Sequence, residues 1–128
     1  MDPVVHFEIP ADNVERAKKF YASLFGWQLN DVPGMDYTLA NTTPVGADQR
    51  PTTPGAINGG MMKRQSAQQR TNVVIKVKSI DATLPRIVQE GGKIAMEKTP
   101  VADMGFTAYF QDPEGNVLGL WQDATARQ

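Results

Sequence analysis

Hydrophobic and polar positions alternate along some segments with the period of a strand and along others with the period of a helix. These segments follow in the same order in each half of the chain. Residues 4–9 alternate with a period of two and are rich in β-branched side chains, which predicts a strand. Between Asn13 and Gly26 the apolar residues recur at helical spacing, framed by a capping residue and a terminating glycine. Strand patterns follow at 27–32, 37–40 and 57–63, the last after a loop over 41–54. The first half therefore predicts a βαβββ unit.

The second half repeats this order after a polar segment over 64–70. A strand is expected at 72–78, then a helix capped by Ser79 or Asp81, then strands at 94–98, 106–111 and 117–122. His6, Asn13 and Gly26 each lie 66 residues before Asn72, Ser79 and Gly92, and an offset of 60 aligns Gly59 with Gly119. We predict one domain over 1–128, built of module 1–64 and module 71–128.

Three segments carry a resemblance to a known superfamily. They are the opening strand and helix from His6 to Trp27, the second helix from Ile80 to Gly92, and Asp112-Pro113-Glu114-Gly115-Asn116 before an apolar strand. In these the chain resembles the vicinal oxygen chelate superfamily of glyoxalase, bleomycin-resistance and extradiol dioxygenase proteins. The resemblance implies an α+β fold in which two βαβββ modules form an open, curled mixed β-sheet around a cleft.

The resemblance also implies where a metal would bind. Enzymes of the superfamily place metal ligands on the first and last strand of each module, and the matching positions here are His6, Gly59, Asn72 and Gly119. Only His6 offers a good ligand, and the chain has one histidine and no cysteine. We therefore expect no metal site of the usual kind and no other cofactor.

Strand alternation then predicts which side chains line the cleft. The candidates form a mostly apolar cup with a few polar groups: His6, Glu8, Ile57, Gly59, Met61, Asn72, Lys76, Val117, Gly119 and Trp121. His6 and Glu8 are the candidate catalytic residues.

Each of these candidates also has a structural interpretation. His6 could be a hydrogen-bonded structural histidine, Glu8 and Lys76 could form a salt bridge, and Trp121 could pack in the core or a dimer interface. The glycines either open room for a ligand or allow strands to approach closely. The acidic segment 112–116 is interpreted as a turn.

The composition of the chain disfavours some classes of binding partner. The 128 residues carry a net charge of −1, which disfavours nucleic acid and polybasic membrane contacts, and no apolar run approaches the ~20 residues of a membrane span. The absence of cysteine fits a reducing, cytoplasmic location. We expect a small amphipathic organic ligand, and a homodimer that covers exposed sheet edges.

Three functions remain open at this point. The first is small-molecule binding of the bleomycin-resistance kind without the metal site. The second is a divalent-metal-dependent lyase or isomerase of glyoxalase type with a non-standard ligand set, for which Glu8 is available. The third is a structural or regulatory dimer without catalysis.

Overall fold

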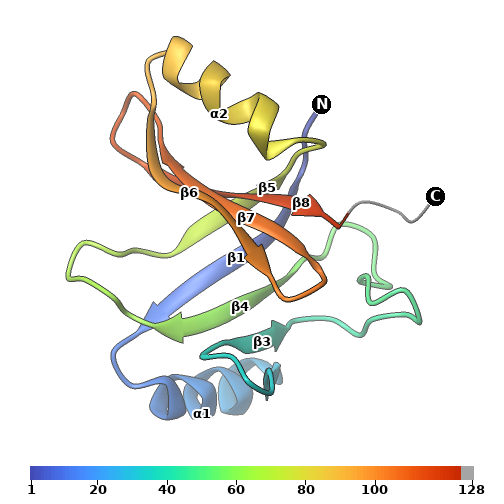
Figure 1. Ribbon diagram of the computed structural model, residues 1–128. Helices are drawn as coiled ribbons and strands as arrows, with labels where there is room; N and C mark the ends of the chain where they lie inside the picture. Colours follow the sequence, from blue (N-terminus) through green and yellow to red (C-terminus); the bar gives the residue numbers. More distant parts are fainter. Residues whose placement is uncertain (125–128) are drawn as a thin grey trace. The chain divides into compact units, whose positions relative to one another are not determined.

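The computed structural model describes residues 1–124, and this part of the chain folds into eight strands and two helices in the predicted order (Figure 1). The elements are β1 (Val4–Ala11), α1 (Val14–Phe25), β2 (Gln28–Asp31), β3 (Thr38–Asn41), β4 (Asn58–Lys63), β5 (Asn72–Lys76), α2 (Ile80–Gln89), β6 (Lys93–Val101), β7 (Gly105–Gln111) and β8 (Val117–Asp123). The α+β class and the repeated βαβββ order are thus confirmed.

Both helices begin at the residues that the sequence marks as caps. The Asn13 side chain accepts a hydrogen bond from the Arg16 N–H at 3.0 Å, and the Ser79 side chain accepts one from the Ala82 N–H at 3.1 Å. Gly26 ends α1 in the left-handed conformation, with φ of 71°. Neither helix in the described part of the chain is long and apolar enough to cross a membrane.

The chain divides into two compact units, whose boundary falls inside β1. One unit comprises His6–Thr71, and we call it the first unit. The other, the second unit, combines Met1–Val5 with the chain from Asn72 onward. The Lys76 N–H donates to the Pro3 carbonyl at 2.9 Å, which ties the N-terminal residues to the second unit.

In the first unit the strands lie in the order β2-β3-β4-β1, with β1 parallel to β4 and the other pairs antiparallel. The helix α1 packs through aromatic rings. The ring centroids of Trp27 and Tyr21 lie 4.8 Å apart in a stacked pair, and those of Trp27 and Phe7 lie 5.6 Å apart. Phe20 and Leu24 belong to the apolar pattern of this helix, but their exposed fractions are 53% and 61%. The helix touches its sheet along a narrower stripe than its apolar pattern suggests.

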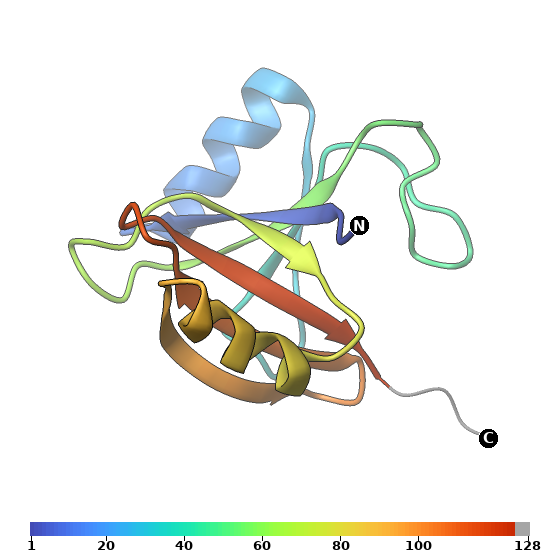
Figure 2. The ribbon, with the colours of Figure 1, turned by 90° about the horizontal axis from the view of Figure 1, so that it is seen from above.

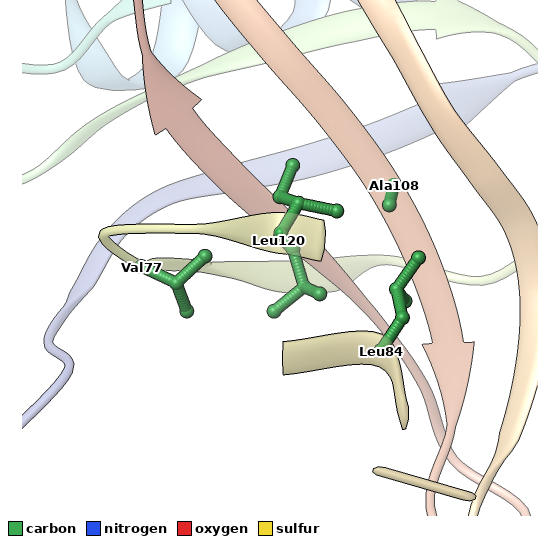
Figure 3. Packing of buried hydrophobic residues seen from close by; sticks show 5 residues of the cluster. Val77, Leu84, Ala108 and Leu120 are labelled. Atoms are coloured by element: carbon green, nitrogen blue, oxygen red, sulfur yellow. The ribbon is translucent and has the colours of Figure 1, made fainter. Parts of the chain in front are cut away.

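In the second unit the strand order is β5-β8-β7-β6, and α2 covers one face of these strands (Figure 2). The core between them is a cluster of buried side chains (Figure 3): Val77, Ile80, Leu84, Ala108 and Leu120. Since Leu120 faces α2, alternation turns Gly119 and Trp121 to the opposite face of β8, as the sequence predicts.

Strand register corrects one part of the repeat. Within the first unit Glu8 pairs with Gly60, and within the second unit Val74 pairs with Gly119. The helix caps Asn13 and Ser79 keep the offset of 66, which matches Glu8 to Val74. Their strand partners Gly60 and Gly119 then correspond at 59 and not at 60. Gly60, not Gly59, is the counterpart of Gly119. A one-residue slip moves every side chain of a strand to the other face, so the predicted faces of β4 are reversed.

Candidate functional site: a buried His–Tyr–Glu cluster

Three polar side chains meet on the face of the first unit that lies opposite α1. His6 Nε2 lies 2.8 Å from the Tyr37 hydroxyl oxygen, and that hydroxyl donates to Glu8 Oε2 at 3.4 Å. His6 and Glu8 are two residues apart on β1 and so share a face, while Tyr37 immediately precedes β3. We call these three residues the His–Tyr–Glu cluster.

The protonation of the cluster follows from its geometry. The Tyr37 hydroxyl has one proton, and if that proton points to the Glu8 carboxylate, the hydroxyl oxygen accepts the proton of His6 Nε2. Both contacts are hydrogen bonds only in this Nε2–H tautomer. Burial lowers the pKa of His6 from 6.5 to about 4, so the imidazole is neutral at neutral pH. A neutral imidazole, a phenol and a carboxylate in series can exchange a proton with a ligand or hydrogen-bond to it.

Tyr37 owes its position to a glycine on the neighbouring strand. A Cβ built on Gly60 would overlap the Tyr37 hydroxyl and ring, so the ring lies directly over Gly60. The Cα partner of Gly60 is Leu39, which makes Tyr37 its diagonal neighbour across the β3–β4 pair. Tyr37 was not among the residues predicted from the sequence. An aromatic residue two positions from the cross-strand partner of a glycine is the signal that could have found it.

The register correction removes two residues from the predicted cleft face. Ile57, Gly59 and Met61 were expected beside His6, but Gly59 pairs with Phe7, and a Cβ there would lie 2.6 Å from the Phe7 ring. Met61 is fully buried and pairs with Ile9. Gly59 and Met61 therefore lie on the α1 side of the sheet, whereas Ile57 precedes β4, so its place on the cleft face stays a prediction.

Asn58, Gly60 and Met62 are the β4 residues that share the face of His6. Asn58 Oδ1 accepts the backbone N–H groups of Thr42 and Thr43, at 2.7 and 3.1 Å, and so fixes the start of the long loop. Its Nδ2 is buried and has no hydrogen-bond acceptor in the described structure.

The second unit brings together a different set of candidates. Asp123 accepts a hydrogen bond from Trp121 Nε1 at 2.7 Å and forms an ion pair with Lys76 Nζ at 2.6 Å, so one carboxylate fixes both side chains. Lys76 and Trp121 are Cα partners, as their predicted common face requires. That these residues line one cleft with His6 and Glu8 stays a prediction, as it does for Asn72 and Val117.

The space that we expected at Gly119 is already filled. A Cβ at this position would lie 3.0 Å from Val74 Cγ2 and 3.2 Å from the Tyr109 ring. An aromatic ring therefore lies over the glycine in each unit, Tyr37 over Gly60 and Tyr109 over Gly119. These glycines serve close packing, which is the structural interpretation, and leave no open volume.

The positions at which the resemblance places metal ligands offer few side-chain donor atoms. Gly60 and Gly119 offer no donor atom, and aromatic rings occupy the space over them. Asn72 offers a neutral amide, and His6 Nε2 is engaged by Tyr37. Within residues 1–124 no group of three or more His, Asp or Glu side chains is placed to hold a metal ion.

The acidic segment near the C-terminus is a turn, as predicted. Asp112 Oδ1 accepts the backbone N–H groups of Glu114 and Asn116, at 2.8 and 2.9 Å. The hydrogen bond from the backbone N–H of Asn116 has the largest effect on the pKa of Asp112, and the bond from the Asn116 side chain has the next largest. Both lower this pKa and keep the carboxyl ionised. Gly115, with φ of 89°, completes the turn.

Comparison with known sequences gives one family, and relatives of different lengths. The sequence profile of the glyoxalase/bleomycin resistance protein/dioxygenase superfamily matches residues 4–120. The chain is 37% identical over 112 residues to CFP32, a candidate glyoxylase of Mycobacterium bovis; the match covers 83% of this chain but 40% of that protein. It is 31% identical over 122 residues to a glyoxylase-like domain-containing protein of Didymella fabae, covering 88% of each. The chain thus spans less than half the length of CFP32.

Solved structures support the fold alone. Methylmalonyl-CoA epimerase from Mycobacterium tuberculosis superposes with a TM-score of 0.65 at 14% identity, over 95% of this chain and 88% of that one. A superfamily protein from Vibrio splendidus superposes with a TM-score of 0.60 at 14% identity, over 96% and 99% of the two chains.

Proposed function

Since the chain belongs to the glyoxalase/bleomycin resistance protein/dioxygenase superfamily, we propose that it binds a small amphipathic organic molecule without the metal ion of the superfamily's enzymes. The observation that supports this most is the Tyr37 phenol, which bridges His6 and Glu8 and lies over Gly60. It occupies the place where a ligand side chain on β4 would have to project, and it engages Nε2 of the single histidine.

The cluster suits a ligand that carries a hydrogen-bonding oxygen. At 3.4 Å the bond from Tyr37 to Glu8 is long and weak, whereas the contact with His6 at 2.8 Å is short. The Tyr37 proton can therefore turn from Glu8 to an incoming carbonyl or hydroxyl oxygen at little cost, while His6 still donates to the phenol. The neutral imidazole brings no net charge, which favours an uncharged polar group on the ligand.

A glyoxalase-type lyase or isomerase that uses a divalent metal is the second candidate, and the candidate glyoxylase CFP32 favours it. In this chain such an enzyme would need Tyr37 to release His6 and Glu8 to become a ligand. Metal analysis distinguishes the two candidates. Protein purified without an affinity tag should contain substoichiometric metal, and a chelator should leave its melting temperature unchanged. One tightly held ion per chain would overturn the metal-free proposal and place the enzyme first.

Binding itself is tested by a thermal-shift screen of amphipathic carbonyl and phenol compounds, since a ligand of the folded state raises the melting temperature by mass action. Each hit is then measured on Tyr37→Phe, which removes one hydroxyl and keeps the ring. Loss of one hydrogen bond should weaken binding by about 3–10-fold. Tyr21→Phe is the matched control, because Tyr21 packs by its ring against Trp27 in the same unit. Equal affinities in the two variants would contradict the proposed role of Tyr37.

A homodimer is part of the same proposal. Phe20, Leu24 and Phe25 expose more than half of their surface on one helix, and apolar side chains grouped in this way favour a protein partner. Two-fold pairing is the commonest symmetric way to cover them. Sedimentation at micromolar concentration should show a species of twice 14.0 kDa, and a purely monomeric profile would reject the dimer.

A further inference from the structure

A second feature of the first unit is a pocket of about 400 Å³ where β3 and β4 meet the start of α1. Its apolar wall includes Val14, Met35 and Met62, and Tyr37 also borders it. Met61 borders it too, but its side chain is fully buried, so Met35 and Met62 are the two methionines that offer surface to a ligand. Methionine is flexible and polarisable, and its sulfur makes favourable contacts with aromatic rings.

The charges around the pocket balance. The Asp31 carboxylate accepts hydrogen bonds from Lys18 Nζ at 3.1 Å and from the Thr38 hydroxyl at 2.7 Å. Both bonds lower the pKa of Asp31, and the bond from Thr38 has the larger effect. Asp36 and Lys63, one charge of each sign, also border the pocket, and neither forms an ion pair in the described structure. A charged ligand would leave one of these groups beside a like charge, and a neutral ligand would not.

We propose that this pocket binds a neutral, planar aromatic molecule of about two fused rings, seated against Met35 and Met62. The volume lies at the small end of the range for small-molecule sites, which suits a ligand of that size. The inference deepens the proposed function and rests on it, since Tyr37 belongs both to the pocket and to the His–Tyr–Glu cluster.

The probe is 2-naphthol, added to protein whose methionine methyl groups carry ¹³C. Ring currents should shift the Met35 and Met62 methyl resonances, each assigned by a Met→Leu variant, and leave Met96 and Met104 unshifted as internal controls. Naphthalene-2-carboxylate, the same rings with a negative charge, should bind more weakly. The proposal is overturned if neither signal moves up to the solubility limit, if Met96 and Met104 shift equally, or if the carboxylate binds more tightly.

Met35→Ala tests the wall itself, and Met104→Ala is its matched control, because both side chains are partly exposed and only Met35 borders the pocket. Losing a sulfur–aromatic contact should weaken 2-naphthol binding about threefold or more. Equal affinities in the two variants would overturn the inference.

Failure of this inference and failure of the proposed function give different results. If 2-naphthol shifts Met35 and Met62 but binds Tyr37→Phe as it binds the parent, the pocket stands and the role of Tyr37 fails. If screen hits move the single His6 resonance and no methionine, the pocket inference fails and the His–Tyr–Glu cluster stands.

Discussion

Lowering the pH should destabilise this protein through one residue, His6. Its pKa is about 4 in the folded protein, below the ordinary 6.5, because burial disfavours the charged imidazole. As the pH falls, the unfolded chain takes up the proton first. The contribution of His6 to stability is therefore fully present above pH 6.5 and is lost as the pH falls from 6.5 towards 4.

The magnitude follows from the two pKa values. One unit of pKa shift corresponds to about 1.4 kcal/mol, so moving from about pH 7.5 to about pH 5 should remove ~2 kcal/mol of unfolding free energy. Urea denaturation followed by tryptophan fluorescence measures this directly, and the midpoint should fall by about 1 M. Carboxyl groups add little in this interval, since the ordinary pKa values of Asp and Glu lie below it.

The control is His6→Gln, which keeps a hydrogen-bonding group beside Tyr37 and removes the titration. Its stability should change little between the same two pH values, although it is lower at neutral pH. If the parent and His6→Gln lose the same stability on acidification, His6 is not buried in its neutral form and the description of the cluster is wrong.

Three further predictions concern packing and the turn. Gly60→Ala should cost about 1–3 kcal/mol because its Cβ displaces Tyr37, and adding Tyr37→Ala should relieve that cost. A Cβ at Gly59 would lie 2.5 Å from the Phe7 carbonyl oxygen, so Tyr37→Ala should not relieve the cost of Gly59→Ala; urea denaturation of the three single and the two double variants decides. Leu120→Ala should cost ~2–5 kcal/mol by leaving a cavity in the α2 core, while Val88→Ala on the exposed side of α2 should stay within about 0.5 kcal/mol, and equal losses would show that α2 does not cover this face. Asp112→Ala should lower the melting temperature because two turn N–H groups lose their acceptor, and an unchanged value would show that the turn holds without them.

The elements were predictable because local chemistry specifies them. Capping residues and terminating glycines bracket both helices, and the offset of 66 between the halves holds because it counts from those same caps. The Asp112 turn was readable for the same reason, since its hydrogen bonds are made within five residues.

The faces of β4 could not be predicted in the same way. Its first residues, Asn58-Gly59-Gly60, show no alternation of apolar and polar side chains, so nothing local fixes their register. The large buried residues further along would have served better: Met61 and Leu120, the least exposed residues of their strands, correspond at the offset of 59. Tyr37 reaches His6 across 31 residues of chain, and only strand pairing brings them together.

The central claim is that Tyr37 holds His6 in a cluster that does not bind a metal ion. The most direct test is to add one equivalent of Zn²⁺ to metal-free protein at neutral pH and to follow the ¹⁵N resonances of the single histidine. We predict that the His6 signals keep their position and report the Nε2–H tautomer throughout. A stoichiometric, saturating change at His6 would contradict the account.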